Sequence, residues 1–121
     1  MNIDAHLAKA RRIESSLAKC THADFETVIE GAMLAGTHWF NALLHLGGLR
    51  TAEHDAVHAE FVSLGERRKL AVAIPAALQA LDQIESLRTS HVRGNMPNGE
   101  QAAKSALDCL AQLRESALSK L

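Results

Sequence analysis

The chain has 121 residues, a length that suits one domain with a hydrophobic core of its own. Thirteen Lys and Arg against 14 Asp and Glu give a net charge of -1, which excludes the overall positive field typical of many nucleic-acid-binding proteins. Hydrophobic residues make up 47% of the chain and aromatic residues only 3%, so small and aliphatic side chains must build the core, and Ala and Leu favour helices over strands.

The cysteines and the start of the chain bear on where the protein resides. Cys20 and Cys109 are far apart and outside any CxxC motif, which favours a reducing compartment. The first residues lack the basic segment and apolar stretch of a signal peptide, and no apolar run approaches the roughly 18 residues that a membrane span needs. We therefore expect a cytoplasmic protein, with residues 1–121 as a single domain and no membrane association.

Apolar residues spaced three and four apart predict two helices in the first half of the chain. The first covers residues 3–20. The second is longer and runs from about residue 24 to residue 46, because capping groups precede it and Gly47 and Gly48 follow it.

The middle of the chain predicts a third helix over residues 51–64. Thr51 can cap it, Glu53 and Asp55 would lie in its first turn, and Gly65 would end or bend it. Residues 70–74, which follow the charged stretch at residues 66–69, can be assigned neither to a helix nor to a loop from the pattern alone.

Two further helices complete the predicted fold. Pro75 suits the first turn of a fourth helix that ends near Gly94, and Asn98 with Gln101 resembles a capping box before a helix that reaches the C-terminus. Such a sequence predicts an all-α, up-and-down bundle of four to five helices.

The second and last helices carry more apolar residues than one core-facing stripe requires. This surplus favours a homodimer, and a tightly wrapped monomer is the alternative. The surplus residues are Met33, Leu34, Ala42, Leu44, Leu107, Leu118 and Leu121.

Three basic side chains gather at the end of the fourth helix. Arg88 and His91 continue the apolar stripe on one side of the helix, and Arg93 precedes Gly94. An arginine and a histidine there could bind a phosphate or carboxylate. The alternative is that the three residues cap the helix, since cations are favourable near its C-terminus.

The second helix carries a polar strip formed by Glu30, His38, Asn41 and His45. This strip either faces solvent or forms a polar network with another helix. If it faces Arg88 and His91, the two sets would line one cleft and bind a ligand together.

A possible metal pair lies in the predicted third helix. His54 and His58 have the spacing of two zinc ligands on one helix face, with Asp55 where metalloproteases place a catalytic Glu. Asp is one methylene shorter than Glu and no third ligand is evident in the pattern. Two histidines on an exposed helix face are therefore the favoured interpretation.

The order of the later elements resembles the HEPN domains. The resemblance rests on the stretch EGAMLAGTHWFNALLH at residues 30–45, followed by Leu87-Arg88 and Val92-Arg93-Gly94 before the last helix. It implies a dimeric helical bundle that acts either as an RNase or as the partner of a small nucleotidyltransferase in a toxin-antitoxin pair.

The family's RNase motif has four to six residues between its arginine and its histidine, whereas two residues separate Arg88 from His91. Two further residues would turn the imidazole by about 200° around a helix. The favoured hypothesis is therefore a HEPN-like binding or regulatory module without a cofactor, for a nucleotide, RNA or a protein partner. A metal-independent RNase using Arg88 and His91 is one alternative, and a metal-binding protein using His54 and His58 is another.

Overall fold

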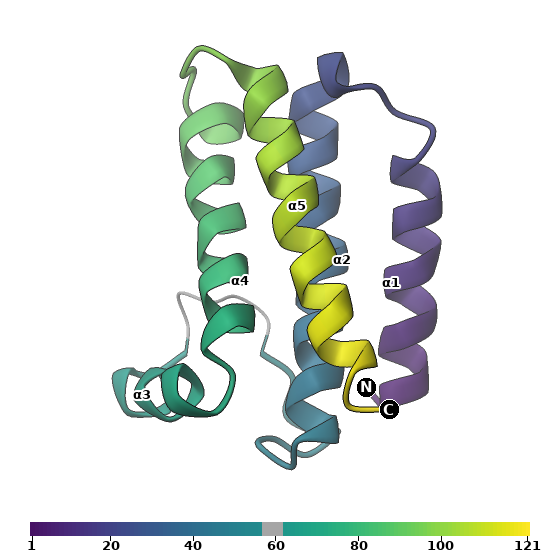
Figure 1. Ribbon diagram of the computed structural model, residues 1–121, viewed down its shortest axis with the longest axis vertical. Helices are drawn as coiled ribbons and strands as arrows, with labels where there is room; N and C mark the ends of the chain where they lie inside the picture. The colour runs from purple at the N-terminus through teal and green to yellow at the C-terminus, as the bar shows by residue number, and fades with distance from the viewer. Residues whose placement is uncertain (57–61) are drawn as a thin grey trace.

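Four long helices run alternately up and down in the computed structural model, which describes residues 1–56 and 62–121 (Figure 1). The predicted all-α, up-and-down bundle is confirmed. A shorter helix, α3, lies across the bottom of the bundle in the view of Figure 1. The elements are α1 (Ile3–Leu17), η1 (His22–Asp24), α2 (Phe25–Leu46), α3 (Leu64–Ala73), α4 (Pro75–Leu87), η3 (Arg88–Arg93) and α5 (Gly99–Leu118).

Helix α2 is the centre of the bundle, because it packs against α1, α4 and α5. A helix with neighbours on several sides needs apolar residues around most of its circumference. Part of the surplus that favoured a dimer is accounted for in this way, since Met33, Ala42 and Leu44 are buried within the chain. Three other surplus residues, Leu34, Leu118 and Leu121, remain exposed. The homodimer stays a prediction.

The first two helices begin and end largely as the sequence predicts. The Asn2 side chain caps α1 by accepting a hydrogen bond from the backbone N–H of Ala5, at 2.8 Å. Helix α1 ends at Leu17, before the predicted boundary at residue 20. Helix α2 ends before Gly47, and Gly48 takes the left-handed φ of 68° that favours glycine.

The predicted helix over residues 51–64 is wrong for the part that the structure describes. Residues 51–56 form no helix, and residues 57–61 lie outside the described residues. Thr51 contacts the ring of His54 at 3.0 Å, while Asp55 and Ala56 bond to α1 and α2. Hydrogen bonds to distant residues therefore outweigh the local capping preference of this segment.

Helix α3 begins later than predicted, at Leu64. The Ser63 hydroxyl accepts a hydrogen bond from the backbone N–H of Glu66 at 3.2 Å, so this serine caps the helix in place of Thr51. Gly65 lies in the first turn of α3 and does not end a helix.

The second half of the bundle follows the prediction with two local differences. Helix α4 begins at Pro75, and its last stretch before Gly94 is the π-helical segment η3. Asn98 precedes α5 as expected, but it has a left-handed φ of 66° and its side chain makes no capping hydrogen bond. Across the described residues, none of the helices is both long enough and apolar enough to cross a membrane.

Candidate functional site

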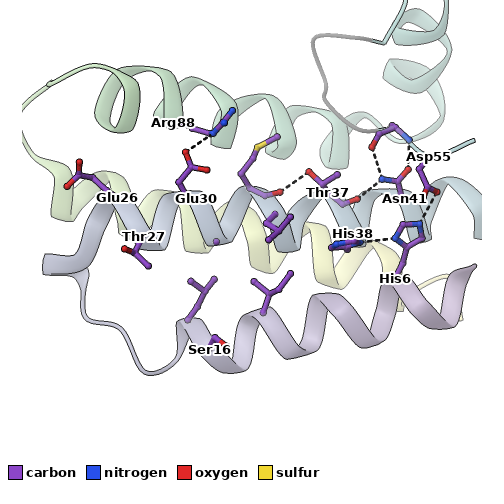
Figure 2. Close-up of a pocket in the computed structure, with 16 residues that line it drawn as sticks. His6, Ser16, Glu26, Thr27, Glu30, Thr37, His38, Asn41, Asp55 and Arg88 are labelled. Carbon is purple, nitrogen blue, oxygen red and sulfur yellow. Dashed lines mark hydrogen bonds and ion pairs between the residues drawn. The ribbon is translucent and has the colours of Figure 1, made fainter. Parts of the chain in front are cut away.

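A groove of about 870 Å³ lies between α1 and α2. Its middle is apolar, with Ile13 and Leu17 from α1 opposite Met33 and Leu34 from α2. Figure 2 shows polar side chains at both of its ends. One end holds His6, His38, Asn41 and Asp55, and the other holds Glu26, Glu30 and Arg88.

Two buried histidines converge on the carboxylate of Asp55. Nε2 of His6 lies 2.9 Å from Oδ1 of Asp55, and Nε2 of His45 lies 2.8 Å from the same oxygen. The side chains of His6 and His45 are 2% and 3% exposed, whereas that of Asp55 is 27% exposed. A single oxygen therefore links α1, α2 and the segment after α2.

Asn41 fixes the position of the segment that carries Asp55. Its side-chain oxygen accepts a hydrogen bond from the backbone N–H of Ala56 at 2.6 Å, and its amide group donates to the Ala56 carbonyl at 2.8 Å. The amide also donates to the Thr37 carbonyl at 2.9 Å. These three bonds hold the residue next to Asp55 against α2, which explains why a buried asparagine is tolerated there.

The electrostatic environment keeps the carboxylate charged. Burial acts to raise the pKa of Asp55, but the hydrogen bonds from His6 and His45 outweigh it and hold that pKa well below its usual range. Burial lowers the pKa of His6 and of His38. At neutral pH this end of the groove therefore combines one carboxylate with imidazoles that favour the neutral form.

The ring of His45 is held at both nitrogens by hydrogen-bond acceptors. Nε2 faces the Asp55 carboxylate, and Nδ1 lies 3.0 Å from the backbone carbonyl of Arg50. A neutral imidazole has one N–H and can satisfy only one of these contacts. A neutral His45 therefore donates to one of the two acceptors and leaves its other nitrogen facing an acceptor.

His38 extends the cluster toward the groove. Its Nδ1 lies 2.9 Å from Nδ1 of His6, so one of these two nitrogens carries a hydrogen and donates a hydrogen bond to the other. Three members of the predicted polar strip, Glu30, His38 and Asn41, line the groove together with Arg88, whereas His45 does not.

The other end of the groove is organised by ion pairs. Arg88 donates to Glu30 at 2.9 Å and to Glu85 at 3.3 Å, and these partners raise its pKa. Arg93 lies 3.7 Å from Glu85. An anion would have to displace carboxylates from both arginines to bind at the predicted basic site.

His91 is placed apart from Arg88 in the structure. It does not line the groove, and Nδ1 of its ring is buried without a hydrogen-bond partner in the described part of the chain. The geometry therefore brings together Arg88 and the strip of α2, but it does not bring His91 to the same cavity.

The structure does not support the helix on which the predicted metal pair, His54 and His58, depends. His54 lies in a non-helical segment and contacts Thr51, and His58 falls outside the described residues. The spacing argument for two zinc ligands on one helix face is wrong for His54, because residues 51–56 do not form that helix.

Two important site residues were missed by the sequence analysis. Asp55 was assigned to the first turn of a helix, and His6 was not singled out. A signal for His6 was present, since it precedes Ala10 by four residues and Ile13 by seven and so lies within the apolar stripe of α1. Its partner Asp55 is 49 residues away, and no local pattern connects them.

Comparisons with models of protein families, with curated proteins and with solved structures find no match to this chain. The resemblance to HEPN domains therefore stays a prediction, and the site is interpreted from its own geometry.

Proposed function

We propose that this protein is a binding module whose site is the groove between α1 and α2. The ligand is a small molecule with an apolar body and one polar head group. The observation that carries this proposal is the groove itself: its volume of about 870 Å³ lies within the range of small-molecule sites, and polar groups gather at the end of an apolar channel.

The contacts at the two ends support one orientation of the ligand. At the Arg88 end, charged groups already neutralise one another and offer little to a head group. At the other end, His6 and Asp55 are partly or fully buried, where a hydrogen bond is stronger than in water. The head group therefore binds beside Asp55 and the apolar body extends toward Leu17 and Leu34.

The test is a fluorescence titration with N-phenyl-1-naphthylamine, a neutral apolar probe whose N–H can donate a hydrogen bond to the Asp55 carboxylate. We expect saturable binding of one probe per chain and at least about tenfold weaker binding to Leu34→Asp, because a charge would enter the apolar wall. Leu34 is 54% exposed, so this change does not alter the core.

The matched control is Val72→Asp, which places the same charge on α3, at a residue that is 84% exposed and outside the groove. The control should bind the probe as the wild type does, and circular dichroism should show equal helix content in all three proteins. Equal affinity of the two variants, or a titration that does not saturate, would contradict the proposal.

The HEPN-like hypothesis implies a nucleotide, RNA or nucleotidyltransferase partner, which remains a separate prediction for the Arg88 end. The cytoplasmic location and the RNase activity also remain predictions. Cleavage of RNA by the wild type that is absent in His91→Ala would support the RNase alternative.

A further inference from the structure

We infer that His6, His45 and Asp55 form a binding site for a divalent first-row transition-metal ion such as zinc. The site lies at the polar end of the groove and is independent of the ligand class proposed for the groove. Each residue offers one ligand atom, and the three atoms lie within 4.8 Å of one another.

The distances are close to those of a metal site without its ion. Zinc bonds of about 2.0–2.2 Å place neighbouring ligand atoms about 3.2–3.6 Å apart in a tetrahedral site. Both histidine Nε2 atoms lie 2.8 to 2.9 Å from Oδ1 of Asp55. Each nitrogen therefore needs to move about 0.5 Å away from the Asp55 oxygen to admit the ion, and all three ligand atoms already lie within 4.8 Å of one another.

The remaining atoms of the ligands have the partners that metal ligands usually have. A histidine that binds a metal through one nitrogen almost always donates its other N–H to a carbonyl, carboxylate or similar acceptor. Nδ1 of His45 faces the Arg50 carbonyl at 3.0 Å, and Nδ1 of His6 faces Nδ1 of His38 at 2.9 Å. With a metal at Nε2 of His45, Nδ1 carries the single N–H and donates it to the Arg50 carbonyl.

The segment that supplies the carboxylate is held in place before any ion binds. Asn41 bonds both backbone groups of Ala56, the residue after Asp55. A preformed ligand set of this kind lowers the cost of ordering the site on binding.

The donor chemistry selects the class of ion. Two imidazole nitrogens and one carboxylate oxygen suit zinc, iron(II) and neighbouring transition metals, whereas magnesium and calcium prefer sites built from oxygen. His6 and Asp55 line the groove and His45 does not, so two of the three proposed ligands border the cavity.

The first experiment uses the wild-type protein, purified without a histidine tag and stripped with a chelator. Calorimetric titration with zinc alone should show one ion per chain, and magnesium should give no binding. Zinc at about 100 times its dissociation constant should raise the melting temperature by about 10 °C.

X-ray absorption of the zinc-loaded wild type should show two imidazole ligands and no sulfur, which distinguishes this site from one that uses Cys20. No zinc binding, or a sulfur-containing ligand set, would overturn the inference. Because these measurements use the wild type, they decide the question even if a variant does not fold. If the wild type binds no zinc but still binds the fluorescent probe, the metal site fails and the proposed function stands. The two failures are therefore distinguishable.

The second experiment locates the site with conservative variants. Asp55→Asn and His45→Asn should each weaken zinc binding by at least about 100-fold, since the loss of a ligand exceeds the roughly 10–100-fold loss typical of an outer-shell partner. His54→Asn is the matched control, because this exposed histidine neighbours Asp55 but contacts Thr51. Zinc binding that depends on His54 and not on His45 would overturn the assignment.

Discussion

The two polar ends of the groove both carry ionisable side chains but differ in how these side chains are paired and buried. At the Arg88 end, Glu30 is 46% exposed and the ion pairs form within reach of solvent. At the Asp55 end, two histidines that are at least 97% buried point at one carboxylate oxygen. At the first end, acidic side chains from other turns of the fold neutralise Arg88. At the second end, His6 and His45 meet Asp55, and no local sequence pattern connects His6 with Asp55.

The comparison shows that convergence of side chains is better evidence for a site than a local cluster of charges. An exposed ion pair contributes little stability and can exchange partners with solvent ions. A carboxylate that is contacted by two buried histidines is costly to disrupt, because removal of one group leaves the others without partners. Variants at the two ends should therefore differ in their effects.

The largest difference is expected for Asn41→Ala at the Asp55 end. The substitution leaves the buried N–H and carbonyl of Ala56 without partners, so the free energy of unfolding should fall by about 2–4 kcal/mol. Urea unfolding in the presence of a chelator measures this loss. Thr37→Val is the control on the same helix, since it removes only a hydrogen bond to the Met33 carbonyl. Equal stability of the two variants would remove the proposed role of Asn41.

A smaller effect is expected at the Arg50–Glu66 pair, which joins α3 to the segment after α2. The hydrogen bond from Arg50 lowers the pKa of Glu66 in the folded state. The pair therefore stabilises the fold above the unfolded-state pKa of about 4.3, and this contribution is lost as the pH falls through the folded-state value.

Glu66→Gln should accordingly lower the free energy of unfolding by about 0.5–1 kcal/mol at pH 7. The difference between the wild type and the variant should shrink as the pH falls below about 4. Unfolding curves at several pH values measure it. A difference that is the same at pH 7 and at pH 3 would show that the ion pair is not its cause.

The smallest effect is expected for Glu30→Gln at the Arg88 end. Because Glu30 is 46% exposed and Arg88 keeps Glu85 as a second partner, the loss should be below about 0.5 kcal/mol and should disappear in high salt. Thermal unfolding at low and high salt checks this. A loss comparable to that of Asn41→Ala would break the distinction between the two ends.

The helices of the bundle could be predicted because their signals are local. Apolar spacing and the terminal residues Gly47, Gly48 and Pro75 act over a few residues, and the structure keeps them. The predicted helix from Thr51 was wrong for the opposite reason. This segment forms hydrogen bonds to residues of α1 and α2 that are distant in sequence.

The candidate site was only partly predictable. His38, Asn41 and His45 were recognised as one strip of α2, because helical spacing places them on one face. Their partners could not be identified, since the pairing of His6 with Asp55 depends on how α1 docks on α2. The sequence predicts an anion site at Arg88, but Glu30 and Glu85 neutralise this arginine in the folded chain. The pairing with Glu30 depends on how α2 packs beside this arginine.

The shared oxygen of Asp55 also affects local unfolding of the bundle. His45 and Asp55 are ten residues apart and stay together when only α1 detaches, whereas the contacts of His6 with Asp55 and His38 cross from α1 to the rest of the chain. Transient opening of α1 therefore dismantles half of the cluster while the other half survives. Amide hydrogen exchange in α1 and loss of the complete cluster should then report the same opening event, with a free energy below that of global unfolding.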